Sequence, residues 1–155
     1  MEYQVRAARI TDVDRLVAIA GGELSADDLD GPLAAADLLR QLVYLPQASV
    51  FVAEGRRGLA GGAVLALRPS VRAGGYVGTV DLLVVDGEHD PDRVTDALLE
   101  ELLRSAGNKG CSIVEAARPT EPDALDRWAR HGFVEAGPHI ERVVAVTGAG
   151  APRTS

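Results

Sequence analysis

The fold is decided by residues 76–104, YVGTVDLLVVDGEHDPDRVTDALLEELLR. The Val- and Leu-rich run 80–85 is typical of a buried strand, and a short acidic turn follows it. Apolar residues then recur at helical spacing, as Val94, Leu98, Leu99, Leu102 and Leu103. Asp90 is a favourable N-cap and Pro91 suits the first helical position, so the stretch predicts a strand that leads directly into a helix. A helix N-terminus presents backbone N–H groups to anions, and this junction is therefore the first candidate for a functional site.

The residues before this stretch predict a strand, two helices and a β-hairpin. Thr11 begins a capping-box-like TDVD, Pro32 suits a first helical position, and EGRRG is typical of a hairpin turn. The expected elements are a strand over 3–9, a helix from Thr11 to Ala20, a helix from Pro32 to about Leu45, and hairpin strands over 49–54 and 59–68. The acidic loop over 23–30 is expected on the substrate side.

The residues after the stretch predict a parallel strand and two closing strands. The expected elements are a helix end near Ala106 capped by Gly107 and Asn108, a strand over 109–116, a helix over 123–130, and strands over 133–136 and 139–146. Because strand, helix and strand follow one another, the strands on either side of the long helix are expected to run parallel. Residues 147–155 offer nothing to bury and are expected to be disordered. Residues 1–146 are expected to form one α/β domain with about seven strands and about four helices.

Composition and charge exclude several classes of function. The 155 residues carry a net charge of −7, which argues against a nucleic-acid partner because phosphate binding needs a basic face. No apolar run reaches the ~20 residues that span a bilayer, and no signal-like segment opens the chain, so we expect a soluble, cytoplasmic protein with no membrane partner. The histidines and the single cysteine, Cys111, lack metal-ligand spacing, so no metal is expected. Cys111 lies in a strand-like run and is expected to be a structural thiol.

The order of these elements, together with two short motifs, resembles the GNAT superfamily of acyl-CoA-dependent N-acyltransferases over nearly the whole chain. In that family, a strand with an L-x-V pattern is followed by a turn of the type R-G-x-G-x-G and a helix that begins x-A-L-L. Leu83–Val85 is similar to that strand and Asp96–Leu99 to that helix, at the same spacing. The second marker is a short helix with an aromatic residue just before Gly-Phe, and WARHGF over 128–133 resembles it.

The resemblance implies an N-acyltransferase that takes an acetyl group from acetyl-CoA and transfers it to an amine of a small molecule or peptide. By resemblance, the pantetheine arm would pair like an extra strand with backbone groups of Leu83, Val84 and Val85. The pyrophosphate would be held by N–H groups around Arg93, Val94 and Thr95. Trp128 stands at the position of a tyrosine beside the cofactor. Homodimerisation through the closing strands is compatible with the sequence.

The turn before the long helix departs from the family pattern. Aligned by spacing, Asp90 stands at the family's Arg or Gln, and the three glycines are replaced by Pro91, Arg93 and Thr95. Only Arg93 and His89 are expected to oppose five nearby carboxylates, those of Asp86, Glu88, Asp90, Asp92 and Asp96. Like charges ~5–8 Å apart cost on the order of 1 kcal/mol each, and the Asp90 cap would compete with a phosphate for N–H groups.

Two carboxylates are candidates for the general base that deprotonates the attacking amine. Asp81 lies on the central strand, where the family often uses a carboxylate, and Glu115 lies on the neighbouring strand. Each has the alternative interpretation of an ion-paired or exposed carboxylate. Trp128 replaces a tyrosine that is thought to protonate the departing thiolate, and an indole N–H has no usable acidity. Tyr76 and Tyr44 are the available replacements, each with a purely structural alternative.

Three interpretations therefore remain open from the sequence. The first is an N-acetyltransferase with a divergent CoA turn. The second is a GNAT-fold protein that has lost CoA binding and acts as a binding or regulatory module, which the acidic, glycine-free turn favours. The third is an unrelated α/β domain. The acidic first loop is compatible with a cationic amine as the acyl acceptor, and equally with a solvated surface.

Overall fold

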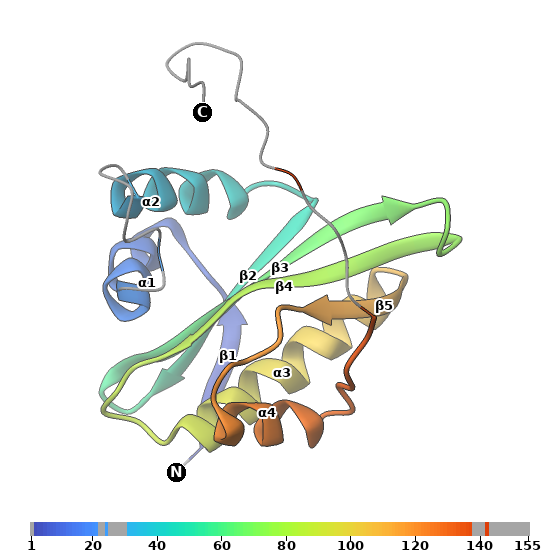
Figure 1. The fold of residues 1–155 in the computed structure, drawn as a ribbon. Helices are drawn as coiled ribbons and strands as arrows, with labels where there is room; N and C mark the ends of the chain where they lie inside the picture. Colours follow the sequence, from blue (N-terminus) through green and yellow to red (C-terminus); the bar gives the residue numbers. More distant parts are fainter. Residues whose placement is uncertain (1, 22–23, 25–30, 138–141, 143–155) are drawn as a thin grey trace.

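The computed structural model describes residues 2–21, 24, 31–137 and 142 (Figure 1). Its elements are β1 (Gln4–Ala7), the short 3₁₀ helix η1 (Ile10–Asp12), α1 (Val13–Ala20), α2 (Gly31–Leu42), β2 (Ala48–Gly55), β3 (Gly58–Ser70), β4 (Gly75–Val85), α3 (Pro91–Asn108), β5 (Cys111–Ala116) and α4 (Pro122–Ala129). The predicted α/β class is confirmed, with five strands in the described residues against about seven predicted. None of the described helices is long and apolar enough to cross a membrane.

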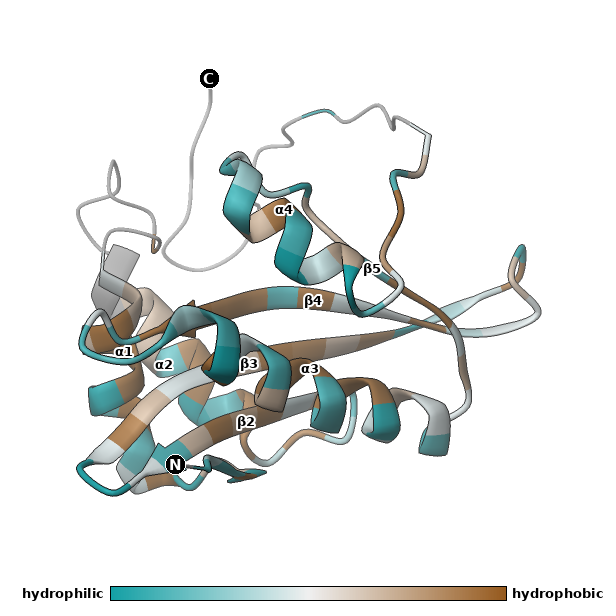
Figure 2. Ribbon diagram, turned by 90° about the horizontal axis from the view of Figure 1, so that it is seen from below, coloured by the Kyte–Doolittle hydropathy of each residue, from teal (hydrophilic) through white to brown (hydrophobic). Residues whose placement is uncertain are grey.

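The strands form one sheet in the order β1-β2-β3-β4-β5. Neighbouring strands are antiparallel except β4 and β5, which run parallel and are connected through α3. The predicted hairpin is confirmed as β2 and β3, with Arg56 and Arg57 in its turn. The predicted parallel pair is confirmed as well, because the long helix returns the chain to the end of the sheet from which β4 started. Figures 1 and 2 both show the end of the β3–β4 hairpin projecting beyond the helices.

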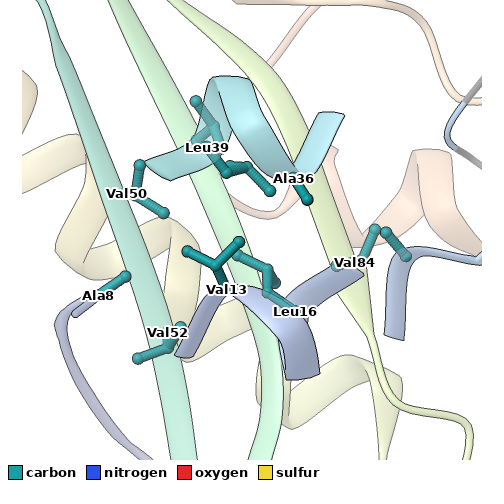
Figure 3. Packing of buried hydrophobic residues seen from close by; sticks show 10 residues of the cluster. Ala8, Val13, Leu16, Ala36, Leu39, Val50, Val52 and Val84 are labelled. Atoms are coloured by element: carbon teal, nitrogen blue, oxygen red, sulfur yellow. The ribbon is translucent and has the colours of Figure 1, made fainter. Parts of the chain in front are cut away.

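Hydrophobic clusters cover both faces of the sheet, and hydrophobic residues are concentrated along its central strands (Figure 2). Figure 3 shows the cluster under α1 and α2, whose members include Ala8, Val13, Leu16, Ala36, Leu39, Val50, Val52 and Val84. The opposite face is covered by α3, which buries Val94, Leu98, Leu102 and Ala106. The helical spacing found in the sequence therefore identifies the face of α3 that packs on the sheet.

The predicted strand over 133–136 is wrong, because residues 133–137 form no strand. Gly132 adopts a left-handed conformation (φ 88°) after α4, and the turn brings Phe133 back onto Trp128. The two rings pack edge to face with centroids 4.9 Å apart. The predicted strand over 139–146 and the predicted tail over 147–155 lie outside the described residues, apart from Arg142, and dimerisation through the closing strands stays a prediction.

The long helix α3 ends later than predicted. It continues through Gly107 to Asn108, and Lys109 donates its N–H to the carbonyls of Ser105 and Ala106 at 3.0 and 3.2 Å. The left-handed residue that turns the chain into β5 is Gly110, with φ 87°. Gly107 is therefore an ordinary helical residue. The turn out of the helix, which the sequence predicts at Gly107, is made by Gly110.

A largely buried ion pair fastens β1 to the first helical segment. The carboxylate of Asp12 accepts two hydrogen bonds from the Arg6 guanidinium, at 2.8 and 3.1 Å. It also accepts the Arg9 N–H at 2.8 Å, so the helical segment begins after Arg9 and not at the predicted Thr11. The hydrogen bonds from Arg6 hold the pKa of Asp12 below its usual range, against the opposing effect of burial.

Replacement of Gly61 by alanine should destabilise the fold where α3 lies over β3. A Cβ at Gly61 would stand 2.5 Å from the Val84 carbonyl oxygen and 2.9 Å from Cγ1 of Val94. We expect Gly61→Ala to lower the free energy of unfolding, measured in urea, by about 1–3 kcal/mol. Gly107→Ala is the matched control, because nothing lies within 4 Å of its added Cβ and alanine should stabilise the helix by about 0.5–1 kcal/mol. Equal stability of the two variants would contradict the close packing.

The Asp12 ion pair should make stability depend on pH in the acid range. Because the folded-state pKa of Asp12 lies below its unfolded value of about 3.9, ionised Asp12 stabilises the fold above that value. The contribution is lost as the pH falls through the folded-state pKa. Asp12→Asn should therefore cost about 1.5–3 kcal/mol near neutral pH, measured by urea unfolding. The difference from the parent protein should shrink below about pH 4, and a difference that does not change with pH would count against the ion pair.

Candidate functional site

The central strand β4 continues past the end of its neighbour β5. Parallel pairing ends at Val80 and Ala116, whereas β4 stays paired with β3 up to Val85, which lies opposite Gly61. On the β5 side, the segment Asp81–Val85 has no partner strand among the described residues, and we call this segment the open β4 edge. An unpaired strand edge presents a row of backbone N–H and C=O groups to an extended ligand.

The three residues predicted to pair with a pantetheine arm, Leu83, Val84 and Val85, all lie on the open β4 edge. Val84 is buried in the cluster under α1 and α2, and the other two pack against the cluster under α3. Their side chains are therefore committed to the two cores. What the edge offers to a ligand is its backbone, which is the kind of contact that the resemblance implies.

A β-bulge marks the beginning of this edge. The consecutive β3 residues Val64 and Leu65 pair with Leu82 and Val80, so Asp81 is an extra residue on β4. A bulge bends and twists its strand locally and redirects a side chain. Asp81 is exposed and lies directly after the last residue of β4 that pairs with β5.

The two carboxylates predicted as general bases lie near each other at the end of the parallel pairing, but in different environments. Glu115 is opposite Thr79, and its Oε1 accepts hydrogen bonds from the Thr79 hydroxyl at 3.3 Å and from Arg68 at 3.4 Å. Asp81 receives no hydrogen bond within the part of the chain that the structure describes. The alternative interpretation of an ion-paired carboxylate therefore holds for Glu115, and it does not hold for Asp81 among the described residues.

The N-terminus of α3 is capped by its own sequence, and the predicted N-cap is confirmed. Asp90 accepts the Asp92 N–H through Oδ1 at 3.0 Å, and its carbonyl accepts the Val94 N–H at 3.1 Å. Pro91 has no N–H, and Thr95 is only 3% exposed. Two of the three positions predicted to hold a pyrophosphate, Val94 and Thr95, are therefore engaged in the helix or buried. A phosphate at this end of the helix needs other donors.

Such donors come from α4 and the turn after it. Arg127 forms an ion pair with Asp92, and Arg130 lies 3.8 Å from the same carboxylate. Arg130 also lies 3.6 Å from Asp96, whose Oδ1 is 2.7 Å from Nε2 of His131. We call Arg127, Arg130 and His131 the α4 cation cluster. It places up to three positive charges beside the first turns of α3.

A further cation reaches the turn from α1, where Arg15 pairs with Asp86 at 2.7 Å. Ion pairs thus engage three of the five carboxylates around the turn, those of Asp86, Asp92 and Asp96. From the sequence, His89 is expected to oppose the carboxylates of the turn. In the structure its Nδ1 lies 3.0 Å from the Tyr3 hydroxyl. The turn is consequently less repulsive to an anion than its sequence suggests.

The aromatic residues considered for catalysis have structural surroundings. Trp128 packs against Phe133 and against the core under α3, so its ring anchors α4 and with it the α4 cation cluster. Tyr76 is 46% exposed and pairs with Cys111, about 17 Å along the strand from Asp81 at ~3.3 Å per residue. Tyr44 follows α2 and is 75% exposed. Tyr76 is too far from the open β4 edge to protonate a thiolate bound there.

Cys111, at the start of β5, is only partly exposed, and burial raises the pKa of its thiol. A protonated thiol inside a strand fits the expected structural role, because the thiolate is the reactive form. In the described ranges of the chain, no group of three or more His, Cys, Asp and Glu side chains could hold a metal ion.

Sequence comparison finds no matching family model and no matching curated protein. Comparison of the structure finds strong similarities. A transcriptional regulator from Bacillus halodurans superposes with a TM-score of 0.78 at 15% identity, covering 92% of this chain and 100% of the other. Glucosamine-6-phosphate N-acetyltransferase from Arabidopsis thaliana superposes with a TM-score of 0.72 at 14% identity, covering 92% of this chain and 99% of the other. Ribosomal-protein-alanine N-acetyltransferase from Brucella melitensis superposes with a TM-score of 0.67 at 18% identity, covering 94% of this chain and 99% of the other.

These similarities extend over nearly the whole chain and mostly concern acetyltransferases. At identities of 22% or less they establish the fold. The chain has the GNAT fold, as its element order and its two short motifs indicate. An α/β domain of a different fold is thereby excluded.

Proposed function

We propose that this GNAT-fold chain is an N-acyltransferase that uses acetyl-CoA to acetylate an amine of a small molecule or peptide. The observation that carries the proposal is the open β4 edge, which runs from the bulge at Asp81 to the turn before α3. An edge of this kind beside a helix N-terminus offers backbone pairing to the amides of a pantetheine arm and a charged end to its phosphates.

In this proposal, the pantetheine amides pair with backbone groups of Leu83, Val84 and Val85. The thioester would then lie near Asp81, just beyond the end of β5, where an amine can approach. Five residues of extended strand span about 16 Å, which provides length for several hydrogen bonds along the arm. Buried and partly buried side chains on the two faces hold this backbone in place, so little ordering is required when the donor binds.

The phosphates would be bound by the α4 cation cluster in place of a glycine-rich turn. The carboxylate of Asp92 is 55% exposed, and exposed ion pairs contribute only about 0–1 kcal/mol. Arg130, whose side chain is 49% exposed, can therefore exchange its carboxylate partners for phosphate oxygens at small cost. Arg127 is 19% exposed and would exchange its partner at a larger cost. Guanidinium groups suit this role because they donate two parallel hydrogen bonds to a phosphate. The proposed phosphate site is then bordered by Arg93, Val94 and Thr95, mainly because of where these residues lie on α3.

The proposed reaction requires one proton acceptor near the thioester. The amine nitrogen attacks the carbonyl carbon, the bond from that carbon to sulfur breaks, and CoA leaves as a thiolate. Asp81, directly or through a water molecule, takes the proton that the amine loses, and the thiolate is protonated from solvent. Glu115 is the second candidate for the base. Positioning of the two reactants supplies much of the rate, so the absence of a tyrosine at Trp128 does not prevent catalysis.

A second function is favoured by one specific observation. The first turn of α3 caps itself through Asp90, and no glycine opens the backbone there to a phosphate. A protein that keeps the GNAT fold without CoA would have this feature and would act as a binding or regulatory module. The two functions differ in whether acetyl-CoA binds at all.

Titration calorimetry with acetyl-CoA at low salt should show binding with a Kd of about 1–100 μM. Arg127→Gln/Arg130→Gln should weaken it at least about tenfold, because charge-assisted hydrogen bonds to phosphate are lost. Asp90→Gly/Asp92→Gly should tighten it, since it removes two negative charges and the partner of Arg127. Arg72→Gln/Arg104→Gln, at exposed positions away from α4, is the charge-matched control and should bind like the parent protein.

Binding that appears only in the Asp90→Gly/Asp92→Gly variant would show that the natural chain has lost its cofactor site, and the regulatory function would replace the enzyme. Unchanged affinity in Arg127→Gln/Arg130→Gln would refute the assignment of the phosphates to the α4 cation cluster.

Asp81→Asn should lower kcat/KM for acetylation of a panel of small amines by about 10²–10⁴-fold. The reaction is measured through the free CoA thiol that it releases. The Kd for acetyl-CoA should stay the same, because the substitution leaves the backbone edge intact. Glu115→Gln is the matched control. In the parent protein the Glu115 carboxylate is held by Arg68 and Thr79, so this substitution should lower kcat/KM by less than about tenfold. The reverse order of effects would make Glu115 the base.

A further inference from the structure

A concave site lies on the side of β4 opposite to the open β4 edge, next to β3 instead of β5. A cavity of about 440 Å³ opens between the β2–β3 turn, α1 and the turn after β4, and its polar lining consists of Arg15, Arg56, Arg57, Asp86, Glu88 and His89. Leu59 lines it as well and packs against the cluster under α1 and α2, so the cavity belongs to that face. The sheet order places β4 itself between this cavity and the open β4 edge.

The charges around the cavity do not cancel. Arg15 and Asp86 neutralise each other through their 2.7 Å ion pair. Neither Arg56 nor Arg57 has a hydrogen bond or ion pair with another described residue, and both are exposed in the hairpin turn. Glu88 is the one remaining carboxylate of the lining. Two arginines against one carboxylate give a local positive excess in a chain whose net charge is −7.

His89 adds an imidazole to this site. Its Nδ1 lies 3.0 Å from the Tyr3 hydroxyl, and the two rings pack edge to face with centroids 5.6 Å apart. When the hydroxyl donates to Nδ1, a neutral imidazole carries its proton on Nε2. That nitrogen can then donate a hydrogen bond to a ligand in the cavity.

We propose that this cavity binds the phosphoryl group of a small phosphorylated molecule, at a site separate from the one proposed for acetyl-CoA. The donors are the guanidinium groups of Arg56 and Arg57 and the imidazole of His89. Several donors around one anion match the three or more oxygens of a phosphoryl group better than the two of a carboxylate. The volume exceeds the needs of inorganic phosphate and falls in the range of small-molecule sites.

Binding there would act on the turn that leads to α3. The turn is fixed at both ends, because the Asp86 N–H donates to the Ala60 carbonyl at 2.7 Å and the His89 N–H to the Asp86 carbonyl at 3.0 Å. His89 directly precedes the N-cap Asp90. A phosphoryl group held by His89 would thus contact the segment that positions the acidic start of α3.

The test is an amide chemical-shift titration with inorganic phosphate and with glycerol 3-phosphate, using glycerol as the uncharged probe. We expect saturable shifts at residues 55–59 and 86–90 with a Kd of about 0.1–10 mM, and none with glycerol. Arg56→Gln/Arg57→Gln should weaken binding at least about tenfold. Arg72→Gln/Arg104→Gln removes the same charge elsewhere, and Arg127→Gln/Arg130→Gln disturbs only the proposed cofactor site. Both should give the same phosphate-dependent shifts at residues 55–59 and 86–90 as the parent protein.

Three results would overturn this site. They are the absence of saturable shifts, equal weakening in Arg56→Gln/Arg57→Gln and Arg72→Gln/Arg104→Gln, and shifts confined to α3 and α4. None of them depends on acetyl-CoA binding, so the failure of this site and the failure of the proposed enzyme are distinguished.

Discussion

The candidate site depends on the early end of the parallel pairing between β4 and β5. The pairing stops at Val80 and Ala116, where β5 ends, and the bulge at Asp81 follows on β4. β4 nevertheless continues as a strand to Val85, because β3 holds its other edge and its side chains pack against the cores on both faces. The close approach of α3 to Gly61 contributes to this rigidity. A strand that is fixed on three sides and open on the fourth can bind an extended ligand through its backbone.

The second determinant is how charge is arranged at the start of α3. The helix caps itself with Asp90 and carries further carboxylates in and before its first turns, which by themselves would repel a phosphate. Arg15 from α1 and the α4 cation cluster offset much of this charge. Anchoring of α4 by Trp128 and Phe133 keeps the cluster in place. Anion binding at this helix would therefore rely on exchangeable side chains of a neighbouring helix, where many such sites rely on backbone N–H groups.

What could be predicted from the sequence is what local chemistry decides. The Asp90 cap, the apolar face of α3 and the β2–β3 hairpin follow from residues close together in the chain. The parallel pairing of β4 and β5 follows from the order of elements. The bulge at Asp81 could not be predicted, because it depends on the register with β3, and no residue at the bulge signals it. The strand expected over 133–136 fails because Phe133 packs on Trp128, a contact that depends on the left-handed turn at Gly132.

The ion pairs of α4 lie between these cases. Arg127 and Arg130 share one face of a helix, as do Asp92 and Asp96, so each spacing is visible in the sequence. Only the packing of α4 beside α3 brings the two faces together, and single-sequence reasoning does not supply that packing. For this reason the sequence overstates the repulsion at the turn. The same limit applies to the cavity at Arg56 and Arg57, whose lining comes from three separate segments.

The most direct test of the central claim is amide hydrogen–deuterium exchange of the peptide that covers 81–85, with and without acetyl-CoA. If the open β4 edge binds the pantetheine arm, exchange in this peptide should slow on addition of acetyl-CoA, with no comparable change in β1 or β2. Binding of acetyl-CoA that leaves exchange over 81–85 unchanged would contradict the account, because the donor would then lie elsewhere on the molecule.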